Sequence, residues 1–228
     1  MKAIILAGGF GSRLKQKVPD LPKPMAPVAG RPFLEYVLDR LVTKNITEII
    51  LSVGYKAELI IDHFGNSYRN KPIRYVIESK PLGTGGAIVK ALHSETESTL
   101  VLNGDTLLNI SFDKLIDDYK QNPARIMLVL KEINDVSRYG SVKINNDRIT
   151  GFLEKGKNLP GYINAGVYIV KPEIFKDFKL SGTFSFETNC LQNYCNELAP
   201  TAFFTDAYFI DIGIPEDYER AQTELPLL

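Results

Sequence analysis

The first half of the 228-residue chain alternates short β-branched runs with amphipathic stretches. Apolar residues recur at helical spacing in 32–44, where Pro32 suits a first helical turn. Because strands and helices alternate, we expect a parallel sheet with helices on both faces. The expected strands are 2–7, 48–53, 73–77 and 99–102, and the expected helices are 32–44, 57–64 and 85–92.

After Asp105 the pattern becomes richer in strands. Ser111 is expected to cap a helix over 111–119, and a turn at 145–147 separates two of the later strands. No internal repeat or linker interrupts the chain, which favours one continuous α/β domain over 1–228 with a mixed, mostly parallel sheet. The later strands are expected at 126–131, 141–144, 149–154, 162–170 and 208–212, with a last helix from Pro215.

Composition narrows the classes of function. The formal net charge is zero and no long basic run is present, which argues against nonspecific binding to nucleic acid or anionic membranes. No apolar stretch approaches the roughly 20 residues that span a bilayer, and the N-terminal apolar run is too short for a signal peptide, so we expect a cytoplasmic chain. Cys190 and Cys195 lie five apart in an expected helix without further ligands nearby, and we interpret them as inert, reduced thiols rather than a zinc site.

A glycine-rich loop, Gly8-Gly9-Phe10-Gly11-Ser12-Arg13-Leu14, comes directly after the first strand. Glycines allow a sharp turn and bring backbone N–H groups close to a phosphate chain. The Walker A pattern is excluded because no Gly-Lys-Ser/Thr closes the loop, and a dinucleotide fingerprint would need glycine in place of Leu14. The segment is therefore expected to be a long loop over a ligand, because no helix interior tolerates its four later prolines, Pro19, Pro22, Pro24 and Pro27.

The same loop carries two cations, Arg13 and Lys23. Pro22 and Pro24 flank Lys23 and restrict its backbone, so that little chain entropy is left to lose on binding. Rigid cations are what a site for several phosphates needs most. The alternative is a surface loop rich in glycine and proline that carries solvated cations.

Two aspartates are candidates for one metal ion. Asp105 ends the motif Asn103-Gly104-Asp105 after a buried strand, where open α/β sheets bind their ligands. Asp211 interrupts an apolar run over 208–213, which is costly unless the carboxylate is paired or metal-bound. Two carboxylates with phosphate oxygens and water would complete the oxygen shell that Mg²⁺ prefers. The alternatives are a turn residue at Asp105 and a helix cap at Asp211.

The loop 8–14 together with Pro22-Lys23-Pro24-Met25 resembles the signature of the sugar-1-phosphate nucleotidyltransferases, and most closely the bacterial guanylyltransferases for mannose 1-phosphate and D-glycero-D-manno-heptose 1-phosphate. The resemblance extends from residue 1 to about residue 220. It implies the nucleotide-diphospho-sugar transferase fold, a Rossmann-like three-layer sandwich with a small β-rich sugar-binding lobe. Residues 1–110 would mainly bind nucleotide and 111–228 mainly sugar.

The resemblance also implies roles for individual residues. The catalytic residues would be Arg13 and Lys23, and Mg²⁺ would be held by Asp105 and Asp211. The nucleotide is expected at Leu6, Ala7, Gly8, Gly9, Gly11, Ser12, Glu78, Pro81, Gly83 and Thr84. The sugar phosphate is expected at Gly140, Glu154, Lys155 and Asn164.

Some of these roles have a physical basis of their own. Glu78 could accept hydrogen bonds from both N–H donors of guanine. The Thr84 hydroxyl could contact a base edge, and Thr84 could at the same time cap a helix. Asn164 offers both a donor and an acceptor. Glu154 and Lys155 are adjacent and would point to opposite faces of a regular strand, unless a bulge or the end of the strand re-aims one of them.

The expected partners are GTP and a sugar 1-phosphate, most closely a heptose 1-phosphate, whose phosphate oxygen would displace pyrophosphate in line. Three alternatives stay open: mannose 1-phosphate as acceptor, UTP or dTTP with a hexose 1-phosphate, and a catalytically silent module that binds an NDP-sugar. The sequence leaves the formation of a homodimer open.

Overall fold

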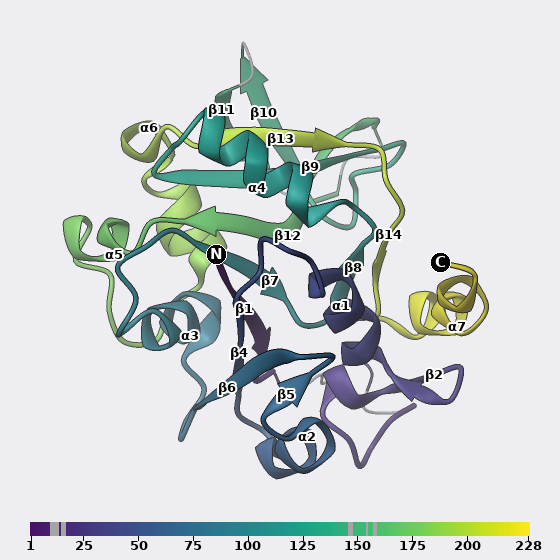
Figure 1. Ribbon diagram of the computed structural model, residues 1–228. Coiled ribbons are helices and arrows are strands. Elements are labelled where there is room, and N and C mark those ends of the chain that lie inside the picture. The colour runs from purple at the N-terminus through teal and green to yellow at the C-terminus, as the bar shows by residue number, and fades with distance from the viewer. Residues whose placement is uncertain (10–13, 15–16, 146–147, 154, 157–158) are drawn as a thin grey trace.

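The computed structural model describes residues 1–228 except 10–13, 15–16, 146–147, 154 and 157–158 (Figure 1). In this part of the chain, one large sheet holds ten strands. They are β1 (Lys2–Ala7), β4 (Glu48–Val53), β5 (Ser67–Tyr68), β6 (Lys71–Ile77), β7 (Thr99–Asn103), β9 (Ile126–Ile133), β10 (Ser141–Asn145), β11 (Arg148–Leu153), β12 (Gly161–Val170) and β13 (Thr201–Thr205). Their order across the sheet is β10-β11-β13-β9-β12-β7-β1-β4-β6-β5.

The centre of the sheet contains a reversal of strand order. β1 pairs in parallel with β4 on one side and with β7 on the other, and β6 extends the sheet beyond β4. The chain thus proceeds outward from β1 to β4 and β6, and then returns across β1 to form β7 (Figure 1). Ligands of open α/β sheets bind beyond the carboxyl ends of strands at such a switch point.

The second half of the chain continues the same sheet. β12 pairs antiparallel with both β7 and β9, while β13 pairs in parallel with β9. The directions implied by these pairings make β1, β4, β6, β7, β9, β10 and β13 run one way, against β5, β11 and β12. The prediction of a mixed, mostly parallel sheet is confirmed, although β13 lies in a segment where the sequence analysis expected no strand.

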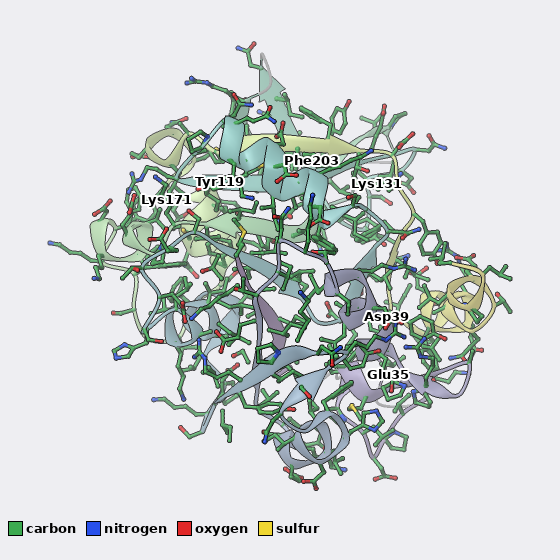
Figure 2. The ribbon with its side chains drawn as sticks, in the orientation of Figure 1. Glu35, Asp39, Tyr119, Lys131, Lys171 and Phe203 are labelled. Atoms are coloured by element: carbon green, nitrogen blue, oxygen red, sulfur yellow. The ribbon has the colours of Figure 1, made fainter. Side chains whose placement is uncertain are left out.

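Helices cover the sheet on both faces, as predicted. One face carries α1 (Phe33–Leu41), α2 (Ala57–Phe64), α4 (Phe112–Gln121) and α7 (Pro215–Glu224). The other carries α3 (Gly83–Ala91), α5 (Glu173–Asp177), the π-helix η2 (Phe186–Gln192) and α6 (Cys195–Leu198). Adjacent strand residues enter different cores because side chains alternate along a strand: Ile4 lies in one cluster and Ile5 in the other. Tyr119 of α4 and Phe203 of β13, both labelled in Figure 2, belong to the first layer.

Local sequence signals correctly predicted the starts of two helices, α4 and α7. The hydroxyl oxygen of Ser111 accepts a hydrogen bond from the Lys114 backbone N–H at 3.3 Å and caps α4. α7 begins at Pro215, where the sequence predicted a helix. In the described part of the chain, no helix combines the length and the apolar character that a membrane span requires.

The two cysteines are buried, but they do not share one helix. Cys190 lies in η2 and Cys195 begins α6. Burial raises the pKa of the Cys190 thiol to about 12, so the reactive thiolate is scarce at neutral pH. We expect native protein at pH 8 to react with a thiol-specific chromogenic reagent only slowly, and guanidinium-unfolded protein to react at once. Equal rates in the two states would contradict this prediction.

Candidate active site

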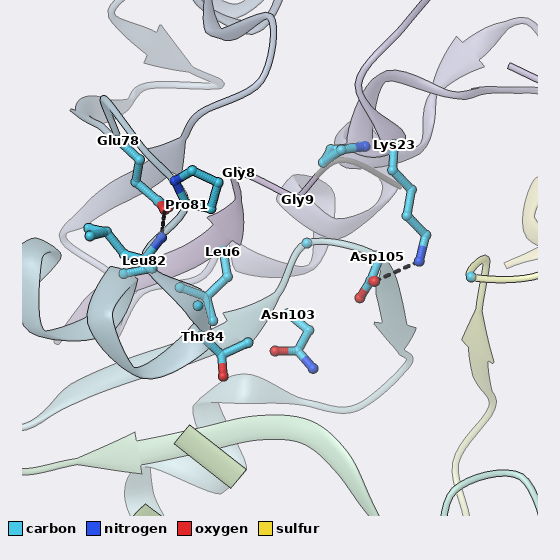
Figure 3. Close-up of a pocket in the computed structure, with 15 residues that line it drawn as sticks. Leu6, Gly8, Gly9, Lys23, Glu78, Pro81, Leu82, Thr84, Asn103 and Asp105 are labelled. Carbon is cyan, nitrogen blue, oxygen red and sulfur yellow. Dashed lines mark hydrogen bonds and ion pairs between the residues drawn. The ribbon is translucent and has the colours of Figure 1, made fainter. Parts of the chain in front are cut away.

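A cleft of about 380 Å³ opens where the carboxyl ends of β1, β6 and β7 meet (Figure 3). The loop after β6 forms one side of it in the picture, and Lys23 and Asp105 form the other. Its lining combines small residues with a few charged groups: Leu6, Gly8, Gly9, Lys23, Pro24, Glu78, Pro81, Leu82, Gly83, Thr84, Ala87, Asn103, Gly104, Asp105 and Gly213.

Gly104 allows the turn after β7 to lie directly against β1. Its backbone N–H donates to the Leu6 carbonyl oxygen at 3.0 Å. A Cβ at this position would lie 2.5 Å from that oxygen, a backbone atom that cannot move without shifting β1. The glycine in Asn103-Gly104-Asp105 is therefore required by close packing of two strand ends.

We expect Gly104→Ala to lower stability by about 1–3 kcal/mol, because overpacking forces a backbone shift. Gly9→Ala is the matched control, since no atom of the described residues lies within 4 Å of the Cβ it would introduce. Thermal unfolding of both purified variants provides the measurement. Equal melting temperatures for the two would refute the packing argument.

Lys23 lies between the two predicted metal ligands. It begins the short 3₁₀-helix η1 (Lys23–Met25), which Pro22 precedes in an extended conformation, and its side chain is 9% exposed. The Lys23 Nζ donates to Asp105 Oδ2 at 2.6 Å and lies 3.7 Å from Asp211 Oδ1. The two carboxylate oxygens are thus no farther apart than the sum of these distances.

Strand pairing brings together two aspartates that are far apart in the sequence. The short strand β14 (Phe209–Asp211) pairs antiparallel with β8 (Thr106–Leu108), which places Asp211 opposite Thr106. The Ile212 N–H also donates to the Asp105 carbonyl oxygen at 3.0 Å. Asp211 Oδ1 accepts from the Gly213 N–H at 2.7 Å, whereas the N-cap of α7 is Ile214, so Asp211 does not cap the last helix.

The carboxylate pair fits a hard divalent cation by its chemistry. Both side chains already face one positive charge, and both are partly exposed, 39% for Asp105 and 24% for Asp211. No group of three or more His, Cys, Asp or Glu side chains suited to a metal occurs in the described residues. Two carboxylates leave further positions of an octahedral shell for phosphate oxygens and water, which are ligands that Mg²⁺ commonly takes.

The loop after β6 is organised by Glu78. Its Oε2 accepts from the Leu82 backbone N–H at 3.2 Å (Figure 3). Its Oε1 accepts from the Ser52 hydroxyl at 3.1 Å. A Cβ on Gly8 would lie 2.7 Å from Glu78 Oε1, so the first glycine of the loop packs against this carboxylate. Each oxygen retains acceptor capacity for a ligand, because a carboxylate offers about four lone-pair sites.

The Thr84 hydroxyl is already engaged within the protein. It donates to Glu187 Oε2 at 2.7 Å and accepts from the Phe186 backbone N–H at 2.8 Å. Thr84 also does not cap α3, which begins at Gly83 after Leu82. The alternative of a Thr84 helix cap is therefore wrong, because the hydroxyl is directed toward a distant segment of the chain.

The described residues expected to bind the sugar phosphate lie outside the lining of the cleft. Gly140 has a φ of +75°, a left-handed conformation that favours glycine. Lys155 is exposed and lies beyond the end of β11, so the strict alternation of a strand does not extend to it. The Asn164 side chain donates to the Tyr168 hydroxyl at 2.8 Å and accepts from the Gly166 N–H at 3.0 Å.

Some predicted residues lie outside the described part of the chain, namely Gly11, Ser12, Arg13 and Glu154. Ala7 is buried at the end of β1, whereas the cleft is lined by Leu6, Gly8, Gly9, Pro81 and Gly83. Their binding of a nucleotide stays a prediction.

Three residues without an expected role lie at or beside the cleft: Asn103, Gly213 and Glu187. The side-chain oxygen of Asn103 is buried and has no hydrogen-bond partner among the described residues. The position of Asn103 in the Asn-Gly-Asp motif could have indicated its place at the cleft. Glu187 had no comparable signal.

Comparison with known proteins gives the family. The model of the nucleotidyl transferase family matches residues 2–226. The D-glycero-alpha-D-manno-heptose 1-phosphate guanylyltransferase of Aneurinibacillus thermoaerophilus is 46% identical over 99% of this chain and 98% of its own length. The mannose-1-phosphate guanylyltransferase of Mycobacterium tuberculosis is 32% identical over 98% of this chain and 64% of its own length.

A solved structure has the same fold along nearly its whole length. HddC from Yersinia pseudotuberculosis matches with a TM-score of 0.83 and 40% identity over 97% of both chains. Its complex with GMP-PN matches with a TM-score of 0.81. The resemblance that the loop motifs indicated is confirmed, and the chain belongs to the nucleotidyl transferase family.

Proposed function

We propose that the protein transfers GMP from GTP to D-glycero-α-D-manno-heptose 1-phosphate and forms GDP-heptose and pyrophosphate. The named activity of the 46%-identical relative and the GMP-PN complex of HddC support this choice of substrates. The observation that carries the reaction type is the buried ammonium of Lys23 between Asp105 and Asp211, at the edge of a cleft at the sheet's switch point.

The chemistry is an in-line displacement at the α-phosphorus of GTP. A phosphate oxygen of the sugar 1-phosphate forms the new P–O bond, and the bond from the α-phosphorus to the bridging oxygen breaks with release of pyrophosphate. The attacking oxygen is already an anion, so the reaction needs no general base. Catalysis then depends on positioning and on offsetting negative charge, which Lys23 does from the wall of the cleft and Arg13 would do from the glycine loop.

Asp105 and Asp211 would hold Mg²⁺ in this proposal. When bound, the ion would neutralise charge on the phosphate oxygens. Lys23 contacts the same carboxylates, so it is placed beside any phosphate that approaches them.

The nucleoside is assigned to the loop after β6. Glu78 remains able to accept from guanine N–H donors while it supports the loop, and the backbone of Gly83 lies at the cleft wall. Gly140, Glu154, Lys155 and Asn164 are proposed for the sugar phosphate. For Thr84, whose hydroxyl is held by Glu187, the proposed contact with the base is through its backbone rather than its side chain.

A pyrophosphate-release screen tests the proposal. Purified protein is combined with each of ATP, CTP, GTP, UTP and dTTP and with mannose, glucose or heptose 1-phosphate, with EDTA controls. We expect the highest kcat/KM for GTP with the heptose 1-phosphate and a loss of turnover in EDTA. A preference for mannose 1-phosphate, or for UTP or dTTP with a hexose, would replace the substrates, and absence of release with every pair would support a silent NDP-sugar-binding module.

A further inference from the structure

Glu187 connects two parts of the site that are far apart in the sequence. It lies in the π-helix η2 and is partly buried. Its Oε2 accepts from the hydroxyls of Thr84 at 2.7 Å and Ser185 at 3.0 Å, and its Oε1 accepts from the Tyr168 hydroxyl at 3.4 Å. Within the described chain it forms no ion pair, so hydroxyl groups alone hold this carboxylate.

On the nucleotide side, the segment around Glu187 is fastened to the start of α3. The Phe184 N–H donates to the Leu82 carbonyl oxygen at 3.1 Å, and the Gly85 N–H donates to the Phe184 carbonyl oxygen at 3.0 Å. A Cβ on Gly83 would lie 2.5 Å from that same oxygen. Thr84 completes the attachment, because its hydroxyl bonds to both Phe186 N–H and Glu187. The base loop and the start of η2 therefore form one packed unit.

On the sugar side, the path from Glu187 passes through Tyr168. Tyr168 is fully buried in β12, and its hydroxyl accepts from the Asn164 side chain at 2.8 Å while it donates to Glu187. The Asn164 oxygen in turn accepts from the Gly166 N–H, which fixes the orientation of its amide. The Thr84 contact at 2.7 Å is short, whereas the Tyr168 contact at 3.4 Å is long, so the carboxylate is held more firmly on the nucleotide side of the path than on the sugar side.

We infer that Glu187 is a positioning residue that couples nucleotide binding to sugar 1-phosphate binding. This inference rests on the proposed function for the identity of the two ligands. A nucleotide that contacts the backbone of the base loop bears on Thr84, and the hydrogen-bonded path through Glu187 and Tyr168 connects Thr84 to Asn164, the residue proposed for the sugar phosphate. Because coupling between two sites is reciprocal, each ligand tightens the binding of the other.

Calorimetric titration measures this coupling without turnover. The nucleotide probe is α,β-methylene GTP, in which carbon replaces the bridging oxygen that would leave, and the second ligand is the heptose 1-phosphate. We expect the wild-type protein to bind the analogue about fivefold or more tightly when the sugar phosphate is saturating. In Glu187→Ala this factor should fall to about one, with each ligand's separate dissociation constant changed less than about threefold. Glu187→Gln, which can still accept from Thr84, should retain part of the coupling.

Further variants distinguish a loss of coupling between the two ligands from a loss of folding. Thr84→Val and Tyr168→Phe each cut the path on one side and should reduce the coupling factor as Glu187→Ala does, which keeps the test valid should that variant fail to fold. Ser185→Ala removes another partner of the carboxylate and the hydroxyl that caps η2, but leaves the path intact. It should lower the melting temperature and retain the coupling.

Three results would overturn the inference: no coupling in the wild-type protein, full coupling in Tyr168→Phe, or a large loss of sugar-phosphate binding by Glu187→Ala in the absence of nucleotide. The last result would identify Glu187 as a direct sugar ligand. The substrate screen decides the proposed function separately. If it selects another pair, the titration is repeated with that NTP's α,β-methylene analogue.

Discussion

Asp105→Asn is expected to lower kcat by about 1,000-fold while leaving the fold intact. The substitution keeps the size of the side chain but removes the charge that faces Lys23 at 2.6 Å. It also removes one of the two carboxylates that are proposed to hold Mg²⁺. We expect their contribution to be largest in the transition state, where negative charge shifts among the phosphate oxygens. Initial rates of pyrophosphate release at saturating substrates, measured across a range of Mg²⁺ concentrations, provide the test.

The control for this variant is Asp62→Asn, because Asp62 is exposed on α2, away from the cleft. Circular dichroism and thermal unfolding establish whether both variants are folded. A folded Asp105→Asn protein with turnover close to that of wild type would remove Asp105 from the catalytic machinery. A rise in the apparent Mg²⁺ requirement would assign its role to holding the ion.

Lys23→Met is expected to lower kcat by about 100- to 1,000-fold. Methionine retains much of the buried aliphatic volume but removes the ammonium, which is the positive charge shared by Asp105 and Asp211. The two carboxylates would then face each other without a cation, so we also expect a lower melting temperature in EDTA. Added Mg²⁺ should raise the melting temperature of this variant more than that of wild type.

Lys114→Met is the matched control, since Lys114 is exposed on α4. This substitution should change neither kcat nor the melting temperature. Wild-type turnover in folded Lys23→Met would contradict the catalytic role of Lys23. If Mg²⁺ raised the melting temperatures of the variant and the wild-type protein equally, this would contradict the view that Lys23 neutralises the two carboxylates.

Local signals in the sequence determined much of the framework. The bounds of β1, β4 and α2 agree with the structure, because hydrophobic periodicity and flanking turn residues act over a few neighbouring positions. The glycine loop and the proline-framed lysine were recognisable for the same reason. The resemblance to the family implied a shared site for Asp105 and Asp211, and the antiparallel pairing of β14 with β8 is what brings them together. The division of the chain into a nucleotide half and a sugar half remains a prediction.

Tertiary structure alone decided the partners of the polar groups. Thr84 could have capped a helix or contacted a base, but its hydroxyl is held by Glu187, 103 positions away in the sequence. Lys23 could have faced solvent, but strand pairing places it against two carboxylates. No local pattern encodes such contacts, because a side chain's hydrogen-bonding capacity is set by its type while its partner is set by the topology that brings distant segments together. The sequence by itself thus determined the elements and the chemical groups of the site, and the packing of the sheet decided which of those groups meet.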